Sequence, residues 1–217
     1  MIEDTEKEKH VAALAAAALV EPGSTVGLGT GSTVARLLPA LAERQLDLRC
    51  VATSPATEDQ ARALGLRVDP FEGIARLDIA IDGADQVAPD GWLVKGGGGA
   101  HTREKVVAAA AERFVVIVSS DKVVEAITPP VPVELLRFGV DATLRSLPGL
   151  RLRPGSGPSP DGGLIGDWDG DTGDPAAVAA MLDAVPGVVA HGLFPPALVT
   201  DILVARRDEV EHRQLRR

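Results

Sequence analysis

The sequence predicts an α/β fold, namely a Rossmann-like, mostly parallel sheet flanked by helices, with a smaller inserted α+β domain. Short apolar runs of strand length alternate with helical patterns over residues 3–118. Because neighbouring parallel strands are joined by crossover helices, this alternation favours a parallel sheet with helices on both faces. After residue 128 the chain becomes rich in proline and glycine turns. We therefore expect a Rossmann-like domain of residues 1–128 and 198–217, and a smaller domain of residues 129–197.

The first part of the chain is predicted to alternate between helix and strand. An Ala-rich helix over residues 3–20 is ended by Pro22-Gly23, and a buried strand follows over residues 25–29. The next helix carries its apolar residues at helical spacing, but Pro39 lies inside the pattern and is expected to kink or shorten it. The other elements predicted here are strands at 48–53, 77–81, 92–94 and 114–118 and helices at 56–64 and 102–113.

The second part of the chain has weaker patterns. Pro129, Pro130 and Pro132 predict a linker, and residues 153–163 (RPGSGPSPDGG) predict a flexible turn region. The apolar run at 198–205 is expected to return to the first sheet as its last strand, followed by a charged, exposed tail at 206–217. The remaining elements predicted here are helices at 141–147 and 175–185 and strands at 164–168 and 187–192.

Composition excludes several classes of protein. A net charge of -9 offers no basic face for coating nucleic acid, although one local basic pocket could still hold a small phosphorylated ligand. The single cysteine, Cys50, excludes an internal disulfide and a cysteine-based metal cluster. The apolar stretch from Val11 to Val20 is too short for a membrane span, and the acidic start lacks the basic region of a signal peptide. We expect a cytoplasmic protein with no nucleic-acid or membrane partner.

The first candidate site is the segment GLGTGST at 27–33, where a predicted strand runs into a helix. Unpaired backbone N–H groups at a helix start favour an anion, and Ser32 and Thr33 add hydroxyl donors. The dinucleotide pattern GxGxxG would need glycine at position 32, so a dehydrogenase is disfavoured. The plain structural alternative is a tight turn with helix caps.

The second candidate site is DGAD, in which Asp82 and Asp85 lie just beyond a predicted apolar strand. Ligands of open α/β sheets bind at the carboxyl ends of the strands. The pair of carboxylates could handle hydroxyl protons or bind a metal, and an Asx turn is the structural alternative.

The third candidate site is KGGGGAHTREK at 95–105. Ordering four consecutive glycines costs much conformational entropy, which indicates that a ligand or oxyanion must approach the backbone closely. Glu104 is expected in the first turn of the following helix, where an acid could also simply complement the helix dipole.

Taken together, these segments resemble the type A ribose-5-phosphate isomerases. The resemblance covers nearly the whole chain in order, and DGAD followed by KGGG and REK at this spacing is its most specific part. The matching words are GTGST at 29–33, DGAD at 82–85, KGGGGAHTREK at 95–105, SSDK at 119–122, PVPVE at 130–134 and DAVPGVVAHGLF at 183–194.

The resemblance implies a fold, an activity and a set of site residues. The implied reaction interconverts D-ribose 5-phosphate and D-ribulose 5-phosphate through a metal-independent enediolate, with no cofactor, in a homo-oligomer that is usually a dimer or tetramer. Glu104 is the implied base, and Lys95 with the glycine N–H groups could stabilise the developing negative charge. Asp82 and Asp85 are candidates for opening the sugar ring, with their division of labour left open. The implied substrate-binding residues are Thr30, Gly31, Ser32, Thr33, Asp82, Gly83, Ala84, Asp85, Lys95, Gly96, Gly97, Gly98 and Lys122.

Two alternatives belong to other functional classes. A non-catalytic sugar-phosphate sensor of related fold would bind the same ligand without turnover, although no basic helix-turn-helix precedes the fold in this sequence. An acyl-CoA transferase would use Glu104 as a nucleophile and would become covalently labelled there by a CoA thioester.

Overall fold

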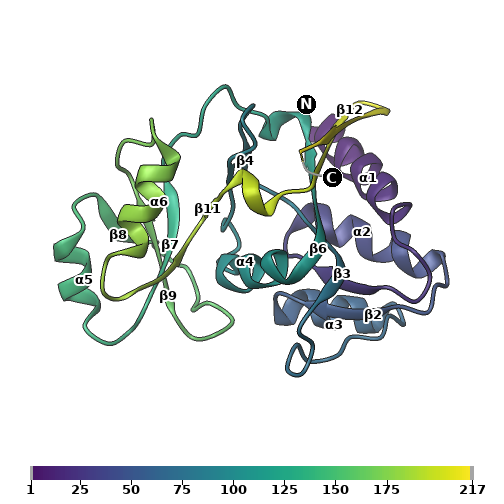
Figure 1. The fold of residues 1–217 in the computed structure, drawn as a ribbon, viewed down its shortest axis with the longest axis horizontal. Helices are drawn as coiled ribbons and strands as arrows, with labels where there is room; N and C mark the ends of the chain where they lie inside the picture. Colours follow the sequence, from purple (N-terminus) through teal and green to yellow (C-terminus); the bar gives the residue numbers. More distant parts are fainter. Residues whose placement is uncertain (1, 216–217) are drawn as a thin grey trace. The chain divides into compact units, whose positions relative to one another are not determined.

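The computed structural model describes residues 2–215, which form two compact units (Figure 1). The first unit contains residues up to 84, residues 104–123 and residues from 197 onward, and the second contains residues 85–103 and 124–196. The predicted domain division at residues 128 and 197 stays a prediction, and the compact units differ from it mainly by grouping residues 85–103 with the second unit.

The first unit is built on a six-stranded sheet in the order β13-β12-β6-β3-β1-β2. Every neighbouring pair from β12 to β2 is parallel, and only β13 runs antiparallel to its neighbour. The predicted α/β class with a mostly parallel sheet is therefore confirmed. The strands are β1 (Thr25–Leu28), β2 (Arg49–Ala52), β3 (Leu77–Asp82), β6 (Ala111–Ser119), β12 (Asp201–Arg206) and β13 (Glu209–Gln214).

Helices cover both faces of this sheet. Val26 and Leu28 of β1 share a core with the buried residues of α1 and α2, whereas Gly27, which points to the opposite face, lies against Val107 of α4. Figure 1 shows α4 on one side of β3 and β6, with α1 and α2 on the other. Pro39 does not end α2, which continues as a helix to Glu43. The helices are α1 (Ile2–Ala17), α2 (Ser32–Glu43), α3 (Pro55–Ala63), α4 (His101–Ala110) and the 3-10 turn η1 (Ser120–Lys122).

Strand order reverses at β1, since β2 lies on one side of it and β3 on the other. Such a switch point leaves a crevice at the carboxyl ends of the two central strands, which is where open α/β sheets bind ligands. The two candidate motifs GTGST and DGAD follow these two strands, β1 and β3, directly.

The second unit holds two antiparallel sheets and two helices. Its larger sheet has the order β10-β7-β9-β8 and its smaller sheet the order β11-β5-β4. A core of apolar residues that includes Val131, Val133, Trp168 and Leu182 lies between the larger sheet and its helices. The elements are β4 (Gln86–Val87), β5 (Leu93–Val94), β7 (Val131–Leu135), α5 (Val140–Ser146), β8 (Leu150–Leu152), β9 (Leu164–Trp168), α6 (Pro175–Asp183), β10 (Val188–His191), β11 (Leu193–Phe194) and the 3-10 turn η2 (Pro196–Leu198), which continues into the first unit.

Two predictions about local structure differ from what the structure shows. Pro132 was expected in a linker but lies inside β7, where its carbonyl oxygen accepts a hydrogen bond from Gly192 N–H. Residues 206–217 were expected to form a charged, exposed tail. Residues 206–215 are mostly exposed, but residues 209–214 are a strand, β13, that pairs with β12; residues 216 and 217 lie outside the described residues. Among residues 2–215, no helix combines the length and the apolar character needed to cross a membrane.

Candidate active site

In the first unit, the GTGST turn and Asp82 are joined by direct hydrogen bonds. Asp82 ends β3 with only 3% of its surface exposed, and its Oδ1 accepts from Thr30 N–H at 3.1 Å and from Gly83 N–H at 2.7 Å. Gly29 makes this approach possible, because a Cβ atom at that position would lie 2.5 Å from Asp82 Cβ and closer still to the carboxyl group. The switch point of the sheet thus brings two of the predicted motifs together.

The turn itself presents backbone and hydroxyl groups at the start of α2. Gly31 precedes the helix with a φ of 119°, in the region that favours glycine. Gly31 and Ser32 are exposed, while the hydroxyl of Thr30 is hydrogen-bonded to that of Thr53 at 2.8 Å. An exposed helix start with adjacent hydroxyl groups is suited to a phosphate.

Glu104 lies in the first turn of α4 and is 4% exposed. Ala111, which follows α4, pairs with Leu77 at the start of β3, whereas Val107 of α4 lies against Gly27, which pairs with Ala80 nearer the carboxyl end of β3. The helix therefore runs back along the sheet, with its first turn toward the carboxyl ends of β6, β3 and β1. Three residues further along α4, Val107 fixes the helix on the sheet, because it occupies the space that a side chain on Gly27 would take. The predicted base is therefore held on a packed helix at the same edge of the sheet as Asp82.

Lys122 follows β6 in the short turn η1 at this edge. The turn is held by Glu8 of α1, whose Oε2 accepts from both the N–H and the hydroxyl of Ser120 at 2.8 Å. Burial raises the pKa of Glu8, but hydrogen bonds from Arg207 N–H and Ser120 outweigh it and hold that pKa below its usual value. Sequence reasoning missed Glu8, because one acid in the run IEDTEKEK carries no distinguishing signal.

In the second unit, Lys95 is a buried lysine with 3% of its surface exposed. The Nζ of Lys95 lies 5.5 Å from the ring centroid of Phe194, a favourable position for a cation. The backbone N–H of Lys95 donates to the carbonyl oxygen of Gly192 at 2.8 Å. Gly192 has no room for a side chain, because a Cβ atom there would overlap the carbonyl oxygen of Lys95. The residues around Lys95 thus fix its backbone and provide an aromatic face for its ammonium group.

The glycine run after Lys95 forms a tight turn, closed by Gly99 N–H donating to Gly96 O at 3.0 Å. Asp85 holds the turn through its Oδ2, which accepts from Gly97 N–H at 2.8 Å. Gly96 has a φ of 110°, and a Cβ atom there would lie 2.7 Å from His101 Nδ1. Asp85, Lys95 and the glycine run therefore all lie in the second unit, and the turn requires glycine at position 96.

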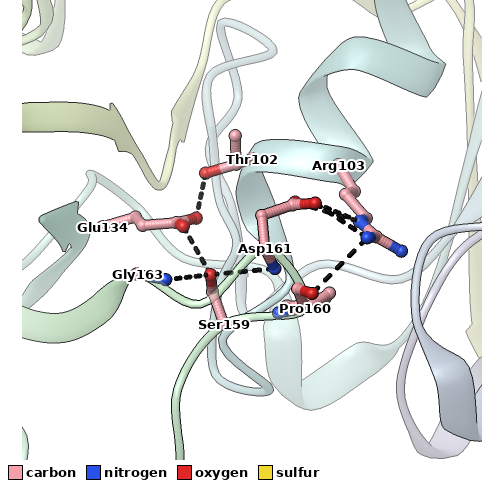
Figure 2. Close-up of polar contacts among 7 residues, drawn as sticks. All are labelled: Thr102, Arg103, Glu134, Ser159, Pro160, Asp161 and Gly163. Atoms are coloured by element: carbon pink, nitrogen blue, oxygen red, sulfur yellow. Dashed lines mark hydrogen bonds and ion pairs between the residues drawn. The ribbon is translucent and has the colours of Figure 1, made fainter. Parts of the chain in front are cut away.

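A buried carboxylate of the second unit anchors the beginning of α4. Figure 2 shows Glu134 of β7 between the hydroxyl groups of Thr102 and Ser159, both of which donate to it. Arg103 adds a two-pronged ion pair to Asp161, with its Nη2 at 2.7 Å and its Nε at 2.9 Å from the carboxylate oxygens. The sequence analysis included PVPVE at 130–134 among the motifs that resemble the family but assigned no role to Glu134. A charged residue within an otherwise apolar strand could have indicated one.

The predicted site residues therefore fall into two groups. One group lies in the first unit and the other in the second, and the chain passes between the units inside DGAD, after Ala84, and inside α4, after Arg103. The first group is Thr30, Gly31, Ser32, Thr33, Asp82, Gly83, Ala84, Glu104 and Lys122, and the second is Asp85, Lys95, Gly96, Gly97 and Gly98. Their roles stay predictions.

A doubly wound sheet with a glycine-rich turn, a buried aspartate and a buried glutamate at its carboxyl edge defines the class of protein. It is an α/β protein built to bind a small molecule at the end of a parallel sheet.

Similarity to known proteins identifies the family within this class. The family model of ribose 5-phosphate isomerase A (phosphoriboisomerase A) matches residues 49–209. The chain is 44% identical over 224 residues to ribose-5-phosphate isomerase A of Chloroflexus aurantiacus, covering 96% of this chain and 93% of that protein. It therefore belongs to the ribose 5-phosphate isomerase A family, and the predicted resemblance is confirmed.

Solved structures agree with this assignment. Ribose 5-phosphate isomerase A of Methanocaldococcus jannaschii superposes with a TM-score of 0.90 at 30% identity, covering 96% of this chain and 99% of that one. A D-ribose-5-phosphate isomerase in complex with phospho-erythronic acid superposes with a TM-score of 0.91 at 30% identity, covering 97% and 99%. The protein is thus an enzyme of the isomerase class.

Proposed function

We propose that this enzyme interconverts D-ribose 5-phosphate and D-ribulose 5-phosphate by a metal-independent enediolate mechanism, as a cytoplasmic homo-oligomer in the non-oxidative pentose phosphate pathway. The observation that carries the proposal is the burial of Glu104 in the first turn of α4, at the carboxyl edge of the sheet. A carboxylate shielded from water on a rigid helix can take a proton from carbon and return it before solvent does.

The reaction moves one carbon-bound proton and leaves the formula of the sugar phosphate unchanged. The Glu104 carboxylate removes the proton from C2 of the open-chain aldose, and the C–H electron pair forms the C1–C2 double bond of the enediolate. The negative charge then rests on the former carbonyl oxygen, where Lys95 and glycine N–H groups act as donors. Glu104 returns the proton to C1, and transfer of the hydroxyl proton from O2 to O1 completes the ketose.

The other predicted residues bind the sugar phosphate and open its ring. The turn from Thr30 to Thr33 and Lys122 bind the phosphate, which is consistent with the exposure of Gly31 and Ser32 at the start of α2. Asp82 and Asp85 serve the sugar hydroxyls during ring opening. One oxygen of each carboxylate already accepts from the backbone, from two N–H groups on Asp82 and from one on Asp85, which fixes the direction of the carboxylate.

An isomerase assay with purified enzyme tests the proposal. We expect the unmodified enzyme to turn over ribose 5-phosphate in the presence of EDTA, and Glu104→Gln to lose several orders of magnitude in kcat while binding is largely kept. Glu21→Gln is the matched control, since Glu21 is exposed after α1, and it should keep full activity.

Each alternative function predicts a different result. Binding of ribose 5-phosphate without turnover by the unmodified protein would indicate a sensor. Covalent labelling of Glu104 by a CoA thioester would indicate an acyl-CoA transferase. Full activity of Glu104→Gln would refute the assignment of the base, and loss of activity in EDTA would contradict the metal-free mechanism.

A further inference from the structure

Arg153, which directly follows β8, is hydrogen-bonded to both the glycine run and the neighbouring strand β9. Its Nε and Nη2 donate to Asp167 of β9 at 2.8 and 2.6 Å, which is a two-pronged ion pair. Its Nη1 donates to the carbonyl oxygens of Gly96 and Gly97, each at 3.0 Å. The guanidinium thus uses one edge for a carboxylate and its remaining amino group for two backbone carbonyls, a geometry that a lysine ammonium cannot reproduce.

These contacts determine how two peptide planes of the glycine run are oriented. In a trans peptide the N–H points opposite to the C=O of the same plane. With Gly96 O directed at Arg153, Gly97 N–H is directed away from it, and that N–H donates to Asp85 Oδ2 at 2.8 Å. By the same geometry, Gly98 N–H points away from Arg153. Arg153 on one side and Asp85 on the other therefore hold a turn that glycine by itself would leave free to rotate.

Further contacts keep Arg153 in place. Its own N–H donates to Ile165 O at 2.9 Å, so the residue extends the pairing of β8 with β9. At the far end of the same connection, Ser159 donates to Glu134 and Asp161 pairs with Arg103 (Figure 2). Residues 153–163, which the sequence predicted to be a flexible turn, are thus attached at both ends to segments that carry predicted site residues.

We propose that Arg153 is a positioning residue of this enzyme, which fixes the two peptide planes between Gly96 and Gly98 so that Gly97 N–H stays on Asp85 and Gly98 N–H is presented to the substrate oxygen. The inference rests on the proposed function, because it assigns the Gly98 N–H group to the enediolate. Donors that are fixed before the reaction stabilise developing charge without reorganising, so a free turn would reduce kcat more than substrate binding.

Three variants separate geometry from charge. Arg153→Met removes both sets of hydrogen bonds, and Arg153→Lys keeps the positive charge but loses the fork. Arg151→Met removes a positive charge two residues earlier on the same strand, where the side chain is exposed, and serves as the matched control. We expect kcat to fall about 30- to 100-fold in both Arg153 variants, because a displacement of about 1 Å in catalytic groups costs about 100-fold. KM should change less than 3-fold, and Arg151→Met should behave as the unmodified enzyme.

Hydrogen exchange of the backbone amides measures the positioning without turnover. In both Arg153 variants the amides of Gly97 and Gly99 should exchange at least 10-fold faster at a temperature where all the proteins are folded. Unchanged exchange would overturn the inference whether or not the enzyme isomerises ribose 5-phosphate, so this outcome is distinct from a failure of the proposed function. Normal kcat in Arg153→Lys would show that charge suffices, and a raised KM with normal kcat would show that Arg153 binds substrate directly. Either result would also overturn it.

Discussion

Substitution of Gly29 by alanine tests the close approach of the GTGST turn to Asp82. No rotamer of Asp82 makes room for a side chain at position 29, because the added Cβ would lie 2.5 Å from the Cβ of Asp82 itself. Rotation about the Cα–Cβ bond does not move that atom. The ends of β1 and β3 must therefore separate by about 1 Å to reach an ordinary contact distance, which strains the 3.0 Å bond from Gly29 N–H to Ile81 O.

The magnitude follows from the contacts that this separation breaks. Overpacking in a well-ordered region costs about 1–3 kcal/mol, and each hydrogen bond to the charged Asp82 contributes about 1.5–3 kcal/mol. Part of this loss is recovered because the turn is open to water. We expect Gly29→Ala to lower the free energy of unfolding by about 2–4 kcal/mol and kcat by about 100-fold.

Urea denaturation and the isomerase assay measure the two effects. Gly157→Ala is the matched control, since a Cβ there meets nothing within 4 Å, and it should leave both quantities unchanged. Combining Gly29→Ala with Asp82→Gly removes the clash and should restore part of the stability but none of the activity. A Gly29→Ala enzyme within 2-fold of normal kcat and within about 0.5 kcal/mol of normal stability would refute the reasoning.

Three further predictions concern buried groups of the first unit. Glu8→Ala should lower the free energy of unfolding by about 1–2 kcal/mol at pH 7 in urea titrations. Folding lowers the pKa of Glu8, so the stabilisation by its carboxylate is fully present above the ordinary pKa of 4.5. This stabilisation is lost as the pH falls through the pKa of Glu8 in the folded protein. The free energies of unfolding of Glu8→Ala and the unmodified enzyme should therefore converge in acid. Burial raises the pKa of Cys50 to about 12, so a thiol reagent at pH 8 should modify the native protein at least about 100-fold more slowly than the urea-unfolded chain. Asp201→Ala should lower the free energy of unfolding by about 3 kcal/mol in the same titrations, because it leaves Arg113 and His212 without their carboxylate partner. The control Asp208→Ala, at an exposed position, should change that free energy by less than about 0.5 kcal/mol.

The sequence predicted the parts of the fold that local patterns encode. β1 and β3 are short apolar runs of strand length and α4 is rich in helix-favouring residues, and the structure contains each within a few residues of its predicted bounds. β13 was missed because EVEHRQ has one apolar residue, and its strand conformation depends on pairing with β12. Pro132 was misjudged because a proline suggests a break, yet β7 tolerates it as a residue whose carbonyl oxygen is bonded.

The candidate site shows the same division. Glycine runs and paired carboxylates are recognisable in a sequence, because few other residues allow close approach to the backbone or supply two acidic groups. The motifs around Asp82 and Lys95 were therefore predicted. Glu134 contacts Thr102, 32 positions away in the chain, and Arg153 contacts Gly96, 57 positions away. The charge of Glu134 within an apolar strand was visible in the sequence, but only the folded backbone shows which hydroxyl groups Glu134 meets and which carbonyl oxygens Arg153 meets.

The charged strand β13 also determines what the sheet exposes at its border. Without it, β12, with its run Ile202 to Ala205, would be the last strand and would offer unpaired N–H and C=O groups on an apolar segment. Such an edge is a template for adding strands from other chains. β13 occupies that template and presents Glu209, Glu211 and Arg213 at the new edge. The segment that the sequence predicted to be a tail is therefore the one that replaces an apolar edge of the sheet with a charged one.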